Sequence, residues 1–184
     1  KGRWILEIDA DERVTPALAL EIRAAIESDP DCFFLIPVDN YIGTRLVRHG
    51  WGCHWGTSAV ARLSKAGQKS WKSARLHPGV CLQGKPVRLH NPLIHYVDRN
   101  FSDQLARLDR YTAARARDLR AHPELDDGLF HHLRRLISRF VKCYYGRKGY
   151  REGLWGFTIA LMAALYPLLS WLRARLEDDE GSVH

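Results

Sequence analysis

The sequence predicts an α/β part over residues 1–100 and a helical tail over residues 101–184. Short apolar runs bounded by glycine and proline dominate the first part, which is typical of strands joined by turns. From Phe101 onward, apolar residues recur at the spacing of an amphipathic helix. Residues 153–172 then contain no charged side chain, so we expect one long apolar helix there.

The first elements are a strand and a helix. Residues 3–8 are mainly apolar and predict a strand. Thr15 is suited to cap a helix, and Pro16 is suited to its first turn. We expect this helix to end at Asp29, ahead of Pro30. Its core-facing stripe consists of Leu18, Ile22 and Ile26.

Further strands are expected along the first part of the chain. Residues 33–38 form a short apolar run, typical of a buried strand. Aromatic and β-branched residues predict two short strands within 41–66, followed by a turn at 65–67. Residues 85–94 predict an extended stretch interrupted by two prolines.

The tail predicts three helices. One begins near Ser102, its expected cap, and ends at His122, and the next spans residues 128–145. The third, over residues 153–172, is long enough at about 1.5 Å per residue to cross a bilayer core of about 30 Å. A buried helix of a soluble protein is the alternative, but little chain remains to cover it. A span, a re-entrant hairpin and an interfacial helix all stay open, because basic residues flank it on both sides.

The charge balance indicates the class of partner. The formal net charge is +7, which favours nucleic acid, anionic lipid or a phosphorylated substrate. The four cysteines lack the spacing of a zinc site. We therefore expect reduced thiols.

The strand at residues 3–8 runs into Asp9 and Asp11, which carry the first candidate chemistry. Two carboxylates one residue apart lie on the same side of a strand, and open α/β sheets bind ligands at the carboxyl ends of their strands. Hard oxygen ligands suit Mg²⁺ or Mn²⁺ bridging a diphosphate. The alternative is that acidic residues here, Glu12 above all, only cap the next helix.

Several blocks of the chain, in order, resemble bacterial family-2 glycosyltransferases, most closely the lipopolysaccharide core β-glucosyltransferase-like branch. The first block, residues 4–14, matches the pattern W-I-L-x-x-D-A-D-E-R-V. Further blocks are segment 41–50, with its Gly-x-x-x-x-x-x-Gly spacing, and the stretches 92–96, 108–112 and 149–153 with the apolar tail behind them.

The resemblance implies a GT-A fold, which is Rossmann-like, and transfer of a sugar from a nucleotide-diphosphate donor, with inversion. It implies that Asp9 and Asp11 bind Mg²⁺ or Mn²⁺ and the sugar diphosphate, where the cation offsets the charge of the leaving group. An inverting transferase also needs a general base. His77 and Asp39 are candidates, with a structural role as the alternative for His77. Many relatives have His-Glu in this segment, and Pro78 stands here in place of the carboxylate.

The acceptor implied by the resemblance is lipid-linked or a lipopolysaccharide core, at the cytoplasmic face of the bacterial inner membrane. Arg45, Arg48 and Arg62 are candidates for binding its phosphates, with solvated arginines as the alternative. Family members carry roughly eighty residues ahead of the Asp9 strand, including the uridine-binding segment. We therefore expect this chain to be the C-terminal part of such an enzyme and inactive alone.

Two other functions compete with this one. The chain is either a catalytically inactive membrane-associated fragment or a basic module that binds nucleic acid through its arginine-rich helices. The second alternative does not account for the uncharged stretch 153–172 or for Asp9 and Asp11. We therefore expect a nucleotide sugar, an envelope acceptor and a membrane surface as partners, and no nucleic acid.

Overall fold

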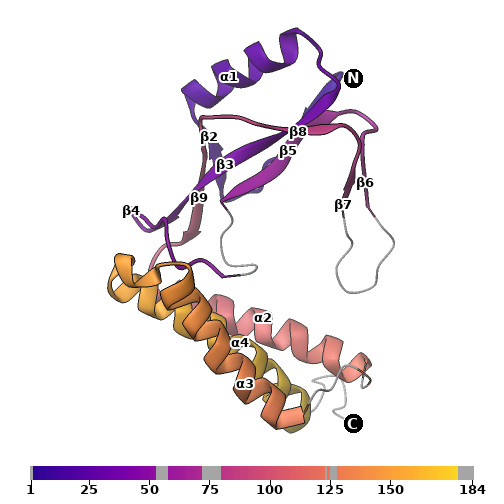
Figure 1. Cartoon of the computed structure of the whole chain (residues 1–184). Coiled ribbons are helices and arrows are strands. Elements are labelled where there is room, and N and C mark those ends of the chain that lie inside the picture. Colours follow the sequence, from indigo (N-terminus) through magenta and orange to yellow (C-terminus); the bar gives the residue numbers. More distant parts are fainter. Residues whose placement is uncertain (1, 53–57, 72–79, 123, 125–127, 178–184) are drawn as a thin grey trace. The chain divides into compact units, whose positions relative to one another are not determined.

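The computed structural model confirms a mixed α/β chain, which divides into two compact units (Figure 1). The sheet unit comprises Lys1–Tyr41 and Thr57–Val97, and the helical unit comprises Ile42–Gly56 and Asp98–His184. The residues that the structure describes are 2–52, 58–71, 80–122, 124 and 128–177.

A curled sheet runs through the sheet unit. Its strands are β1 (Trp4–Leu6), β2 (Glu12–Val14), β3 (Cys32–Ile42), β5 (Ala59–Lys65), β8 (Lys85–Arg88) and β9 (Leu93–Asp98). They follow the order β1-β5-β3-β9-β2, with β8 also pairing with β3. The pairs β1/β5, β3/β5 and β2/β9 are antiparallel, whereas β3/β8 is parallel. A separate two-stranded ladder joins β6 (Lys69–Trp71) to β7 (Val80–Leu82).

The long strand β3 forms because its side chains alternate between a buried and a half-buried face. Helix α1 (Pro16–Glu27) packs Leu18 and Ile22 against the buried face, as predicted. Thr15 caps this helix by accepting the Leu18 N–H at 3.1 Å. The resulting core contains Leu18, Ile22, Phe34, Ile36, Leu63, Leu89 and Leu93.

Two expectations about the sheet need correction. The first strand is shorter than residues 3–8, because β1 ends at Leu6 and the chain then turns. β1 also ends the order of strands and pairs antiparallel with β5. Asp9 and Asp11 therefore lie in a turn between two strands, and the rule for carboxyl ends of parallel strands does not apply to them.

The helical unit contains the three predicted helices. They are α2 (Phe101–Ala121), α3 (Gly128–Val141) and α4 (Leu154–Leu176). Between α3 and α4 lie the π-helical turn η2 (Lys142–Gly146) and the 3₁₀ turn η3 (Gly149–Glu152). The cap of α2 is Asn100 and not Ser102: its side chain accepts the Asp103 N–H at 2.9 Å. The unit also holds the short strand β4 (Arg45–Leu46).

Helix α4 packs against both α2 and α3. Its inner side is rich in small residues, and Gly156 lies so close to Gly149 that a side chain at residue 156 would overlap the Gly149 carbonyl oxygen. Among the described helices, α4 is long and apolar enough to cross a membrane, although buried helices of soluble proteins meet the same criterion. The rest of the unit buries 44% of the residues in the most apolar window of α4, so the helix is covered in part.

Candidate functional site

The turn between β1 and β2 is held by Glu12. Its carboxylate accepts the Asp9 N–H at 3.0 Å, and the Glu12 N–H donates to the Asp9 carbonyl at 3.0 Å. Arg62, on β5, donates to the same carboxylate at 2.7 Å. The Glu12 side chain is only 3% exposed, so its charge is paired inside the protein. Glu12 thus closes this turn, while Thr15 caps the helix that follows.

Asp9 and Asp11 project from this turn toward solvent. Their side chains are 61% and 53% exposed, in contrast to Glu12. Asp9 forms an ion pair with Arg62. Asp11 places Oδ2 at 3.4 Å from Nε2 of His95. The Asp-x-Asp-Glu segment therefore divides into one carboxylate that is buried in the turn and two that are exposed beside it.

Arg62 stays cationic at this position. Burial alone would lower the pKa of its guanidinium, but hydrogen bonds and charge from Glu12 and Asp9 raise the pKa above its ordinary value. The arginine predicted to bind the acceptor is therefore an internal partner of the turn. Its side chain is 18% exposed.

His95 belongs to the same cluster, and sequence reasoning did not single it out. Nδ1 of His95 lies 2.8 Å from Oδ1 of the buried Asn40, and Nε2 faces Asp11. The antiparallel pairing of β2 with β9, which sets Glu12 opposite His95, brings the ring to the turn. In the sequence, the signal that could have identified His95 is the pair of polar residues, His95 and Tyr96, inside an otherwise apolar run. Asn40 fixes one side of the ring, and the other ring nitrogen faces the Asp11 carboxylate.

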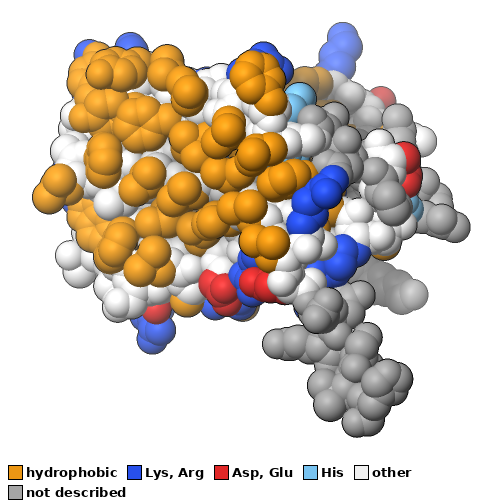
Figure 2. All heavy atoms as spheres, turned by 90° about the horizontal axis from the view of Figure 1, so that it is seen from below, with side chains coloured by type: hydrophobic (Ala, Val, Ile, Leu, Met, Phe, Trp, Pro, Cys, Tyr) orange, Lys and Arg blue, Asp and Glu red, His pale blue; other side chains and the backbone are white. Residues whose placement is uncertain are grey.

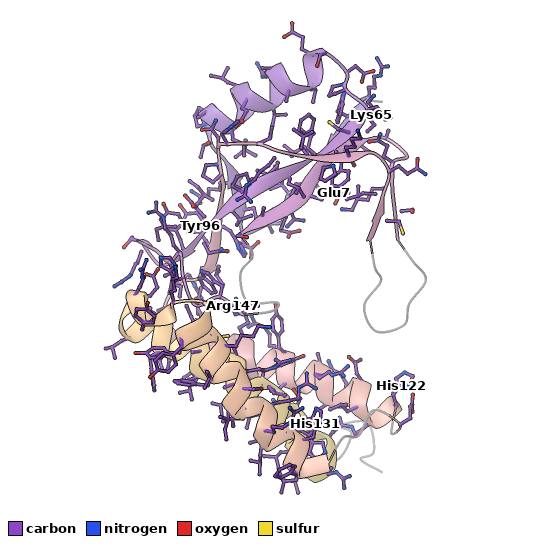
Figure 3. All side chains as sticks on the ribbon, viewed as in Figure 1. Glu7, Lys65, Tyr96, His122, His131 and Arg147 are labelled. Carbon is purple, nitrogen blue, oxygen red and sulfur yellow. The ribbon has the colours of Figure 1, made fainter. Side chains whose placement is uncertain are left out.

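An aromatic pair lies on the other face of β9 from His95, because successive side chains of a strand point to opposite faces. Tyr96 is labelled in Figure 3, and its ring lies 5.8 Å from that of Tyr41 and 5.1 Å from the Arg13 guanidinium. Tyr96 is 38% exposed, so part of its ring faces solvent. Aromatic rings that remain exposed offer an apolar face to a ligand.

The donor set of this turn fits a divalent cation only in part. Within the described residues, no group of three or more His, Cys, Asp and Glu side chains is placed to hold a metal. Mg²⁺, however, commonly binds one or two carboxylates together with waters and substrate phosphates. Asp9 and Asp11 are carboxylates of this kind, because both are exposed and on one turn. They fit a cation whose remaining ligands come from a diphosphate and water.

The other predicted residues are distributed over both units. Asp39 is half-buried on β3, beside Asn40. Arg45 and Arg48 belong to the helical unit, where the buried Glu152 carboxylate accepts the Arg48 N–H at 3.0 Å and lies 3.7 Å from the Arg45 guanidinium. His77 falls outside the described residues.

The helical unit carries a second candidate site, an exposed surface that we call the apolar face. Figure 2 views the molecule from below and shows hydrophobic side chains gathered over much of this side, with Lys and Arg near its edges. Exposed basic residues on the same elements include Arg134, Lys148 and Arg151. The apolar face consists of Leu129, Phe130, Leu133, Ile137, Val141, Tyr145, Leu154 and Phe157.

Comparison with known proteins returned no match: no protein-family model, no curated protein and no solved structure is similar to this chain. The resemblance to glycosyltransferases therefore depends on the sequence blocks alone.

Arg62→Ala is expected to destabilise the sheet unit. It leaves the Glu12 carboxylate buried without its cation, which costs more than about 2 kcal/mol of unfolding free energy. Urea unfolding measures the loss, and Arg62→Ala combined with Glu12→Gln should recover part of it. The control is Arg3→Ala, which removes an ion pair to Asp29 from a side chain that is 74% exposed and should cost less than about 1 kcal/mol. Equal losses for Arg62→Ala and Arg3→Ala would show that Glu12 does not depend on Arg62.

Proposed function

We propose that this chain is the C-terminal part of a GT-A-type, inverting glycosyltransferase. It transfers a sugar from a nucleotide-diphosphate donor to a cell-envelope acceptor such as lipopolysaccharide core, at the cytoplasmic face of the bacterial inner membrane. The observation that carries the proposal is the turn at residues 9–12. A buried ion pair fixes the turn, and Asp9 and Asp11 are left exposed on it.

In this proposal Asp9 and Asp11 hold a divalent cation against the donor diphosphate. When bound, Mg²⁺ or Mn²⁺ offsets the negative charge that develops on the leaving diphosphate. Glu12 and Arg62 keep the turn rigid, and His95 orients the Asp11 carboxylate. A preorganised turn of this kind saves the free energy of ordering it when the ligand binds.

The other requirement of the reaction is binding and deprotonation of the acceptor. The acceptor hydroxyl gives its proton to a general base, for which Asp39 and His77 are the candidates. The exposed Tyr96 ring, supported by Tyr41, suits the apolar face of a sugar ring. The residues that bind the nucleoside are expected in the segment that precedes this part of the enzyme in the family.

Some of the arginines that suggested nucleic-acid binding instead hold the helical unit together. Several arginines of the helical unit are bound within it: Arg107 pairs with the buried Asp98 at 2.7 Å, and Arg173 pairs with Asp109 at 2.6 Å. Arg99 pairs with Asp103 at 2.6 Å. Binding to a phosphate backbone relies on cations that are available to it, and these three already have carboxylate partners.

The apolar face is proposed to contact the membrane. Phe130 and Ile137 are 81% and 64% exposed on α3, which is the arrangement of a helix that lies along a bilayer surface. The basic residues Arg134, Lys148 and Arg151 suit anionic headgroups. A second copy of the chain is a poorer occupant, because pairing two such faces would bring their basic borders together.

Asp11→Asn tests the metal assignment. The chain is expected to bind Mn²⁺ in the presence of a nucleoside diphosphate, and Asp11→Asn should weaken binding at least tenfold. The thermal midpoint should stay unchanged, because the Asp11 side chain is 53% exposed. Electron paramagnetic resonance of free Mn²⁺ measures the affinity. The matched control is Glu27→Gln, an exposed carboxylate of the same unit. Unaltered Mn²⁺ affinity in Asp11→Asn, or equal loss in the control, would contradict the assignment.

Ile137→Glu and Phe130→Glu test the apolar face. Each places a charge in the proposed lipid contact and is expected to weaken binding to vesicles with anionic lipid at least tenfold in a sedimentation assay. Leu20→Glu is the control, since Leu20 is 68% exposed on α1 in the sheet unit. If all three variants bind as the unchanged chain does, the face does not contact lipid. If Ile137→Glu converts a dimer to a monomer and leaves vesicle binding intact, the face joins two copies instead.

A further inference from the structure

The loop at residues 44–49 carries Arg45 and Arg48, and a buried carboxylate holds it in place. That carboxylate belongs to Glu152, which is 7% exposed. One of its oxygens accepts the main-chain N–H groups of Arg48 and His49, both at 3.0 Å. Because Glu152 lies 104 residues after Arg48 in the sequence, these hydrogen bonds join two distant segments of the helical unit.

The same two segments make further contacts beside Glu152. The Gly50 N–H donates to the Arg147 carbonyl at 2.9 Å, and the Arg147 guanidinium donates to the Trp51 carbonyl at 2.6 Å. Residue 50 has a φ of +83°, and a side chain there would come within 2.9 Å of the Gly149 Cα, so this close approach requires glycine. The loop therefore has a defined position on the turns that precede α4.

The two arginines of the loop differ in their contacts. The Arg45 guanidinium donates to the Glu152 carbonyl at 3.3 Å and lies 3.7 Å from the Glu152 carboxylate. Arg48 gives its main-chain N–H to Glu152, and its side chain is exposed. Among the residues that the structure describes, none pairs with the Arg48 guanidinium. Arg48 is therefore the arginine of this loop whose side chain is available to a ligand.

The chemistry and the place of Arg48 indicate the ligand. A guanidinium group is planar and donates paired hydrogen bonds, which match the oxygens of a phosphoryl group. The turn η3, which ends at Glu152, leads directly into α4, where Leu154 and Phe157 of the apolar face are 83% and 42% exposed. When the apolar face contacts a bilayer, a group bound at Arg48 therefore lies near the level of the lipid headgroups.

We infer that Arg48 determines specificity for a phosphoryl group of the acceptor at the bilayer surface, and that Glu152 is the positioning residue for Arg48. The acceptor is then a phosphorylated, lipid-linked compound and not a soluble oligosaccharide. Arg45 instead contributes to the structure of the loop. This inference rests on the proposed function, because it takes the acceptor and the membrane contact from there.

Binding to lipid vesicles tests the role of Arg48. The chain is sedimented with phosphatidylcholine vesicles that contain phosphatidic acid, whose headgroup is a phosphomonoester, and with vesicles of phosphatidylcholine alone. Arg48→Gln is expected to weaken binding to the phosphatidic acid vesicles by about tenfold and to leave binding to phosphatidylcholine unchanged. Arg23→Gln is the matched control, because it removes the same charge from an exposed position on α1. Equal weakening by Arg48→Gln and Arg23→Gln would overturn the inference.

Coupling between the two residues tests the role of Glu152. Glu152→Leu should weaken binding to phosphatidic acid as Arg48→Gln does, and adding Arg48→Gln to it should have little further effect. Glu152→Gln keeps an oxygen for the two N–H groups and should retain most of the binding. Where Glu152→Leu does not fold, Glu152→Asp takes its place, because it keeps the charge and withdraws the oxygens. Additive losses in the double variant would show that Glu152 does not position Arg48.

Two further arms separate this inference from the proposed function. Glucose 6-phosphate presents a phosphomonoester in solution, and equally tight binding of it that depends on Arg48 would overturn the placement at the bilayer. Asp11→Asn should leave binding to phosphatidic acid unchanged. If Mn²⁺ binds through Asp11 and Arg48→Gln has no effect, this inference alone fails. If Arg48 binds phosphatidic acid and Mn²⁺ does not bind, the sugar-transfer function fails and the contact between Arg48 and phosphate remains.

Discussion

The structure of the helical unit depends on shielding the apolar side chains of α4 from water. Its residues 154–172 are all uncharged, and they include Ile159, Ala160 and Ala164, which are fully buried; α2 and α3 supply the cover. Small side chains let the helices approach closely, and their burial removes apolar surface from water. The cover is incomplete, since Leu154 and Phe157 at the start of α4 remain exposed. The apolar face continues from there onto α3.

The other end of α4 is polar. Arg173 donates to Asp109 at 2.6 Å and to Thr112 at 3.1 Å, and Arg120 donates to the Arg173 carbonyl at 3.2 Å. Moving α4 alone into a bilayer would break these contacts and uncover α2, and charged side chains are costly at the bilayer centre. This network favours a helix that stays within its unit, and the proposed lipid contact is then limited to the outer apolar face.

The sequence predicted those features that depend on neighbouring residues. The strand over residues 33–38 and the three helices of the tail follow from local apolar spacing, and Thr15 caps α1 as expected. The partners of the candidate site were not predictable in this way. His95 reaches Asp11 because β2 and β9, which lie some eighty residues apart in the sequence, pair with each other. Arg62 forms an ion pair with the Glu12 carboxylate, which is buried. Charge alone suggested that Arg62 binds an acceptor, since sequence does not reveal burial.

The central proposal is that the helical unit contacts the membrane through its apolar face and that α4 does not cross the bilayer. Cysteines placed at Arg151 and Glu177, which flank α4 and are exposed, test it in a chain whose four native cysteines are replaced by alanine. Sealed inside-out membrane vesicles from bacteria that express each variant are treated with a membrane-impermeant thiol reagent. Both positions are expected to react from the outside without detergent. Reaction at one position only, with the other requiring detergent, would show that α4 spans the membrane.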